Sequence, residues 1–205
     1  MALSRGTGVG GDGRYQRPFF RAVVSTEYAI PGDTRMRWPY KRTVLALCTL
    51  AFSATMAARM AISPVVPLIR ADFAVSNTVV GVALTALWMS YFLAQFPSGV
   101  LADRFGERPV ILVSLGGTAL ASLALALSPV FAAFVLATVA LGALAGLHYS
   151  VGTTLLTRTY DDVGKAIGVH TAGGPIAGLA VPGVAAWVGG RYGCEPAIAI
   201  GAVVA

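Results

Sequence analysis

The sequence predicts an all-α integral membrane protein, and three observations support this fold class. Of the 205 residues, 56% are hydrophobic and only 12% are charged, whereas a soluble domain carries about 25% charged residues. The mean hydropathy is +0.73. Apolar runs of roughly 20 residues recur along the chain, which is the length that a helix needs to cross the ~30 Å hydrocarbon core of a bilayer. We therefore expect the core of the protein to lie inside the membrane.

Residues 1–42 show no sustained periodicity, and we expect a flexible cytoplasmic tail there, or partly an upstream extension if translation begins at Met36. The first span is expected at 43–62 and should stop at Pro64 and Pro67, because proline interrupts a helix. Further spans are expected at 78–100, 109–128, 130–152, 166–188 and 196–205. The last is incomplete, since ten residues rise only ~15 Å. The sequence is therefore interpreted as a fragment or a disrupted gene.

The distribution of charge predicts the orientation of the chain. The net charge is +6, but eight of the fifteen Lys and Arg residues lie within residues 1–42, which favours an orientation signal over nucleic-acid binding. Basic residues recur on alternate connections, at 101–108 and 153–165. We therefore expect a multi-pass protein of the cell membrane with its amino terminus in the cytoplasm.

Several other functions are not supported by the residue pattern. Gly6, Gly8 and Gly11 match a dinucleotide fingerprint, but no βαβ unit surrounds them. Cys48 and Cys194 have neither metal-ligand spacing nor an evident disulfide. No nucleophile–base pair or phosphate-binding loop is found. The sequence thus predicts no enzyme, no cofactor and no metal.

A charged segment joins the second and third spans, and we expect 101–108 to form a loop too short to cross the bilayer. Its sequence, from position 99 to 108, is Gly-Val-Leu-Ala-Asp-Arg-Phe-Gly-Glu-Arg. This resembles the loop between the second and third helices of major facilitator superfamily transporters. The matching residues are Gly99, Leu101, Asp103, Arg104, Gly106 and Arg108, whereas Glu107 departs from the basic pattern.

The likeness extends over roughly 43–205 and implies an amino-terminal half of such a transporter, with five complete helices and a truncated sixth. It implies that Asp103 takes part in a gating latch whose helix-end partner lies in the absent second half. The alternative is that this segment is only a solvated turn, in which Gly106 allows the chain to reverse direction.

Arg59 is the only charged residue inside a predicted span, and such residues are functional candidates by default. By helix rise it lies about 24 Å above Thr43, close enough to the outer interface for its side chain to snorkel. First helices line the central cavity in the superfamily, so the resemblance favours contact with substrate or a coupling ion. Both readings stay open.

His148 and His170 are the only histidines, and both are expected ~6–9 Å from the cytoplasmic boundary on neighbouring spans. Histidines in such positions suit proton coupling or a gate. The alternative is that both are neutral and hydrogen-bonded to the backbone or to water. Tyr91 and Gln95 share a helix face and are candidates for polar cavity contacts. Small residues are expected to pack helices closely, namely Gly142, Gly146, Gly174, Pro175 and Gly178.

Two functions remain from the sequence alone. The first is secondary active transport of a small solute by alternating access, with a proton or another ion as the coupling partner. The second is a truncated or half-size membrane protein that does not transport and only assembles with a partner chain. The sequence names neither the solute nor the direction of transport.

Overall fold

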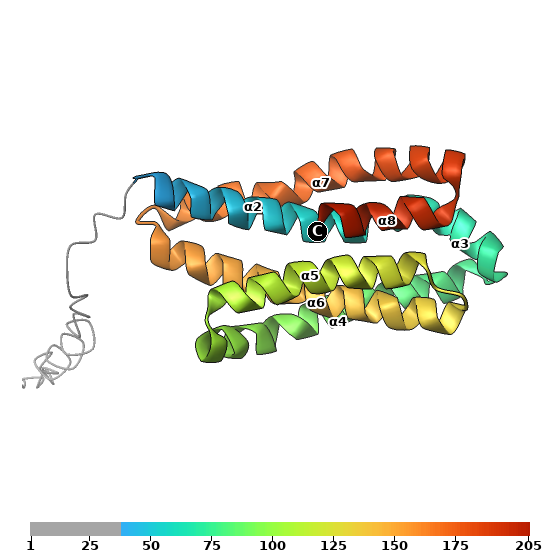
Figure 1. The fold of residues 1–205 in the computed structure, drawn as a ribbon, viewed down its shortest axis with the longest axis horizontal. Coiled ribbons are helices and arrows are strands. Elements are labelled where there is room, and N and C mark those ends of the chain that lie inside the picture. The colour runs from blue at the N-terminus through green and yellow to red at the C-terminus, as the bar shows by residue number, and fades with distance from the viewer. Residues whose placement is uncertain (1–37) are drawn as a thin grey trace, which may run out of the picture. The chain divides into compact units, whose positions relative to one another are not determined.

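A computed structural model describes residues 38–205, and every regular element within them is helical (Figure 1). The expectations for the amino-terminal tail, for Gly6, Gly8 and Gly11, and for Met36 lie outside the described residues. The elements are α2 (Trp38–Met60), the 3-10 turn η1 (Ser63–Val65), α3 (Val66–Phe73), α4 (Asn77–Phe105), α5 (Glu107–Ala126), α6 (Phe131–Thr159), α7 (Val163–Tyr192) and α8 (Cys194–Val204).

Five helical segments are long and apolar enough to cross a membrane. The first runs continuously over Tyr40–Phe73, and the others are α4, α5, α6 and α7. Helix α8 is apolar but shorter. The prediction of an all-helical membrane protein is thus confirmed. Each predicted span has a counterpart, with ends that differ by a few residues.

Helix α2 ends at Met60, just before Pro64, as expected for the first span, but the chain soon becomes helical again. Helix α2 begins at Trp38, before the predicted start, and after two turn residues the chain continues through η1 and α3 to Phe73. Each proline occupies one of the first two positions of its helix, where its missing N–H would have no intrahelical partner in any case. The prolines therefore restart the helical path.

The connections are shorter than the sequence suggested. The predicted loop 101–108 reduces to Gly106, whose φ of +87° favours glycine, while 101–105 complete α4. Helix α6 likewise continues through the expected polar break as far as Thr159. Two helix starts have side-chain caps: Ser76 accepts from the N–H of Val79 at 3.3 Å and Asp162 from that of Lys165 at 3.1 Å.

The helices form two groups that pack along their lengths (Figure 1). Helix α2 packs on α7 and α8, and α6 packs on α4 and α5, while α5 joins the groups through α8. Buried apolar side chains fill the space between them, among them Ile62, Ile69, Leu87, Leu125, Phe134 and Leu141.

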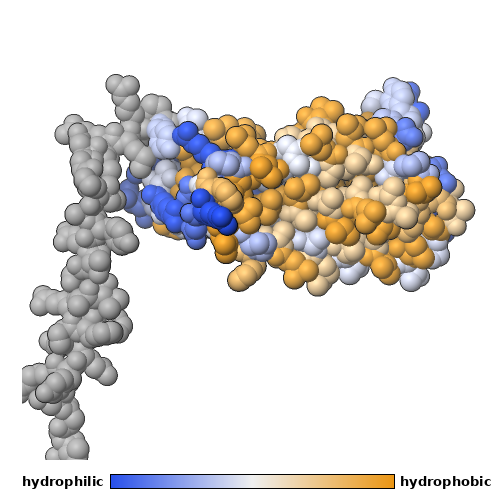
Figure 2. All heavy atoms as spheres, turned by 60° about the horizontal axis from the view of Figure 1, so that its bottom comes forward, coloured by the Kyte–Doolittle hydropathy of each residue, from blue (hydrophilic) through white to orange (hydrophobic). Residues whose placement is uncertain are grey.

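The outer surface is apolar over the middle of the bundle, and polar residues gather towards its ends (Figure 2). Phe96 and Leu179 are each 86% exposed, and Leu136 is 72% exposed. Large apolar side chains in such positions are unfavourable in water and suit lipid. This surface is that of a bundle surrounded by lipid.

Candidate functional site

Arg59 is buried inside the bundle. Arg59 lies in the last turn of α2, about 28 Å by helix rise from Tyr40, and the candidate span continues through a turn, η1 and α3 to Phe73. Its side chain is only 3% exposed. This burial favours contacts inside the bundle over the snorkelling interpretation.

The guanidinium of Arg59 is incompletely satisfied. Its Nε donates to the carbonyl of Thr55 at 3.0 Å, but neither Nη1 nor Nη2 has a hydrogen-bond partner among the described residues. The rings of Tyr91 and Trp88 in α4 flank the guanidinium carbon at 4.0 and 5.2 Å. Cation–π contacts are worth about 2 kcal/mol when desolvated, whereas burial of an ion costs several kcal/mol. The rings offset only part of the cost.

The histidines come together, as the order of their helices allowed. His148 in α6 and His170 in α7 are both fully buried, with ring centroids 5.7 Å apart. Phe52 of α2 packs on His170 at 5.0 Å. His148 lies about 16 Å by helix rise from the end of α6 at Thr159, which is deeper than predicted because α6 is longer than expected.

The hydrogen bonds of the imidazoles are also incomplete. Nε2 of His148 donates to the carbonyl of Cys48 at 3.2 Å. Nδ1 of His148 and both ring nitrogens of His170 are buried without a partner among the described residues. Unpaired buried polar atoms are costly and uncommon. With Arg59 they are buried polar groups that lack hydrogen-bond partners among the described residues, and we call the three residues the polar track: Arg59, His148 and His170.

The predicted packing glycines are placed unequally. A Cβ on Gly142 would collide with the Leu87 carbonyl, and one on Gly146 with the Tyr91 carbonyl, so these glycines let α6 approach α4. At Gly174 a Cβ would lie 3.0 Å from the ring of Phe52. Gly178 would meet nothing within 4 Å and does not share this packing. The exposed ring of Pro175 lies inside α7.

Tyr91 and Gln95 lie one turn apart on α4. Tyr91 is buried and turns its ring to Arg59, whereas Gln95 is half-buried. The carbonyl of Gln95 accepts from Ser98 at 2.7 Å and from Ser150 of α6 at 3.3 Å. The Gly146 contact and the Ser150 bond thus brace α4 against α6 on either side of the polar track.

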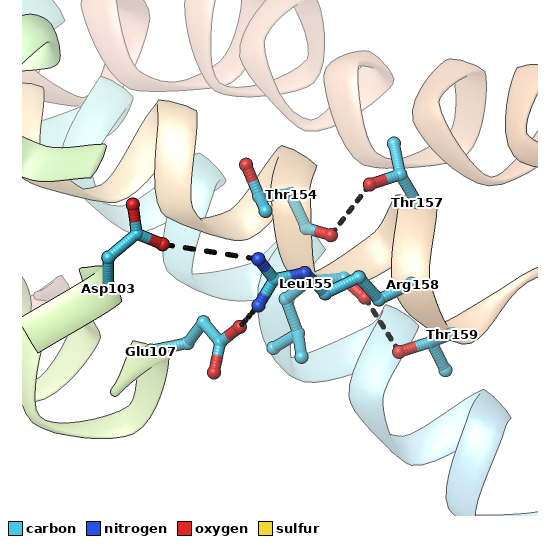
Figure 3. Close-up of polar contacts among 7 residues, drawn as sticks. All are labelled: Asp103, Glu107, Thr154, Leu155, Thr157, Arg158 and Thr159. Atoms are coloured by element: carbon cyan, nitrogen blue, oxygen red, sulfur yellow. Dashed lines mark hydrogen bonds and ion pairs between the residues drawn. The ribbon is translucent and has the colours of Figure 1, made fainter. Parts of the chain in front are cut away.

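Two acidic residues of the charged segment contact a basic residue of this chain, while the predicted latch with a helix end of a second half stays a prediction. Arg158, near the end of α6, donates to Glu107 at 2.6 Å and lies 4.0 Å from Asp103 (Figure 3). Glu107, the departure from the basic pattern, therefore faces a basic residue. Arg104 and Arg108 are exposed, and Leu101 is half-buried. Nearby, Lys41 pairs with Asp161 at 3.3 Å. These contacts join the starts of α2 and α5 to the end of α6.

No three His, Cys, Asp or Glu side chains between residues 38 and 205 are grouped so that they could hold a metal ion. A cavity of about 840 Å³ opens between α2 and α5, but its lining is mostly apolar and the polar track is not part of it. The polar track holds most of the buried polar atoms in the described bundle that lack a hydrogen-bond partner; the others are on Arg70, Thr118 and Ser122.

Comparison with known proteins decides the family. The profile of the Major Facilitator Superfamily matches residues 47–205. The chain belongs to this superfamily. Over 128 residues it is 33% identical to the tetracycline resistance protein, class C, of Escherichia coli, a match that covers 57% of this chain and 32% of that protein. The chain thus spans about a third of the length of this curated relative.

Membership of the superfamily makes the chain a multi-pass membrane protein of the transporter class, and not an enzyme. The resemblance seen in the motif between α4 and α5 is confirmed. The matched region begins inside α2 and takes in the whole polar track, so the unsatisfied Arg59 and histidines lie within the superfamily domain.

Sequence reasoning missed Trp88, Phe52 and the partner of Arg158. Trp88 precedes Tyr91 by three residues, and this spacing on a helix places both rings on one face. Glu107 and Arg158 carry opposite charges at the ends of spans expected to meet the same membrane surface. Both signals were present in the sequence, but choosing among many such pairs required the tertiary structure.

Proposed function

We propose that this protein takes part in secondary active transport of a small solute across the cell membrane by alternating access. The observation that carries the proposal is Arg59, a buried cation inside a span with two free donor nitrogens in a superfamily domain. Charged residues inside membranes mark substrate or ion pathways, and transporter sites lie near the bilayer midplane. The depth of Arg59 agrees with both rules.

His148 and His170 are the proposed site of the coupling ion, a proton. Two neighbouring imidazoles with unpaired nitrogens can accept a proton and pass it on. Tyr149 is the other titratable ring beside them, 6.3 Å from His170. In the His148→Gln/His170→Gln protein, uptake should persist without its dependence on pH. Unchanged pH dependence would remove the pair from the coupling step.

The proposed orientation places the start of α2 in the cytoplasm. The contacts of Arg158 with Glu107 and of Lys41 with Asp161 gather the basic residues Lys41, Arg104, Arg108, Arg158 and Lys165 at one end of the bundle. Excess Lys and Arg mark the cytoplasmic side. A reporter that is active only outside the cytoplasm, fused within the loop at Gly193, should be active, and the same insertion at Gly106 should be silent.

Proteoliposomes that contain the purified chain test the function directly. Under an imposed proton gradient, at least one solute from a panel of organic acids, amines and neutral compounds should accumulate, and a protonophore should abolish the accumulation. The Arg59→Lys protein should lose it, while Arg191→Lys should retain it. If the inserted chain moves no solute, the transport proposal fails and the non-transporting, partner-assembling protein is favoured.

A further inference from the structure

We propose that the solute is a small organic anion, whose carboxylate is bound by Nη1 and Nη2 of Arg59 and whose apolar part lies against Trp88 and Tyr91. This inference rests on the proposed function, and it names the substrate class of the same site. It follows from the charge balance around Arg59, the geometry of the free nitrogens and the residues that flank them.

The charge of Arg59 has no counter-ion in the described bundle. An arginine guanidinium stays protonated in proteins, so the positive charge persists inside the span. All acidic residues between positions 38 and 205 lie at helix ends and none is buried: Asp72, Asp103, Glu107, Asp161, Asp162 and Glu195. The anion that balances Arg59 must therefore come from another source.

The free donors match a carboxylate in number and spacing. The Nε bond to the Thr55 carbonyl anchors the guanidinium at one edge, while Nη1 and Nη2 at the other are buried without a partner among the described residues. Two parallel N–H donors form the fork that binds a carboxylate bidentately. An ammonium or a neutral amine offers no such pair of acceptors, so a cationic solute does not fit this site.

The flanking rings predict the rest of the ligand. Tyr91 and Trp88 lie 5.8 Å apart, edge to face, and both rings contact the guanidinium. Tyr91 is buried and held by its helix against Gly146, whereas Trp88 is half-buried. We propose that the half-buried Trp88, rather than the buried Tyr91, moves to admit a ligand to the fork. A planar or apolar group attached to the carboxylate would take the place that the Trp88 ring leaves.

The test uses benzoate with two isosteres, the neutral benzamide and the cationic benzylamine, on the purified full chain. Benzoate should raise the thermal unfolding temperature in a saturable manner, and the isosteres should not. Arg59→Lys keeps the charge but removes the fork and should weaken benzoate binding at least tenfold. Arg191→Lys is the matched control, because Arg191 also contacts a tryptophan, Trp187 at 5.5 Å, but is exposed. It should bind benzoate as the wild type does.

Equal shifts with benzoate and benzamide, or no shift with benzoate, overturn the anion assignment, and neither outcome depends on any variant folding. No shift would also result if a carboxylate of the chain itself occupied the fork. The flux assay separates this inference from the proposed function. Uptake of a non-anionic solute leaves the function intact and overturns the anion site, whereas benzoate binding without flux supports the site and contradicts transport.

Discussion

Arg59 and Arg158 carry the same guanidinium in opposite surroundings. Arg59 is 3% exposed inside a span and has no carboxylate near it among residues 38–205. The side chain of Arg158 is 62% exposed at the end of α6 and contacts the carboxylates of both Glu107 and Asp103. Burial of a charge costs free energy, yet the buried Arg59 lacks a carboxylate partner among the described residues, whereas the exposed Arg158 has two. Stability alone would favour the reverse arrangement, so the position of Arg59 indicates a role in binding.

The largest expected effect comes from removing the charge of Arg59. Arg59→Met replaces an unpaired buried ion by an apolar side chain of similar length and should stabilise the bundle by about 2–3 kcal/mol. The gain in stability should accompany loss of the benzoate response. Denaturation in detergent measures the first effect and the benzoate-induced shift the second. A less stable Arg59→Met protein would show that the guanidinium is a structural support, and the contrast with Arg158 would fail.

A smaller effect is expected when the helix packing that holds Tyr91 beside Arg59 is disturbed. Gly146→Ala places a Cβ against the Tyr91 carbonyl and 3.1 Å from the Cβ of Ala94, so α4 must move away from α6. We expect a loss of about 1–2 kcal/mol and weaker benzoate binding, because the ring over Arg59 shifts.

Gly178→Ala is the matched control for this change, since its Cβ would meet no atom within 4 Å. Its stability and its benzoate affinity should stay close to those of the wild type. Equal behaviour of the two variants, in unfolding and in binding, would mean that the close approach of α6 to α4 does not position the site.

The smallest effect is expected at Arg158. Arg158→Gln should cost at most about 1 kcal/mol, because exposed ion pairs contribute little and salt screens them. The exchange Arg158→Glu/Glu107→Arg should restore most of the loss, and benzoate binding should not change in either protein. Unfolding at low and high salt provides the measurement. A loss that persists at high salt would show that the contact acts through packing and not through charge.

The fold could be predicted largely from the sequence, because apolar runs, capping residues and charge bias are local signals. Ser76 was expected as a helix cap from the sequence and caps α4 in the structure. Pro64 follows the end of the first helix, as expected, but a proline that breaks one helix also suits the first turn of the next. The sequence therefore did not reveal that η1 and α3 continue the chain beyond Arg59.

The sequence singled out most residues of the candidate site but did not show which residues contact one another. Arg59, Tyr91, His148 and His170 were singled out by residue type and position. Their neighbours Trp88 and Phe52 were not, because aromatic residues in a membrane helix most often face lipid or core. The absence of a carboxylate beside Arg59 within 38–205 depends on where six acidic residues lie in space, which spacing along the chain does not reveal.

The most direct test of the central claim, that Arg59 binds an anion through its free fork, is a crystal structure of the protein with 4-iodobenzoate, in which the iodine is located by anomalous scattering. We predict an iodine site beside Trp88, with the carboxylate oxygens about 2.7–2.9 Å from Nη1 and Nη2 of Arg59. A fork occupied by a carboxylate side chain of the protein, with iodine only at the lipid-facing surface, would contradict the account.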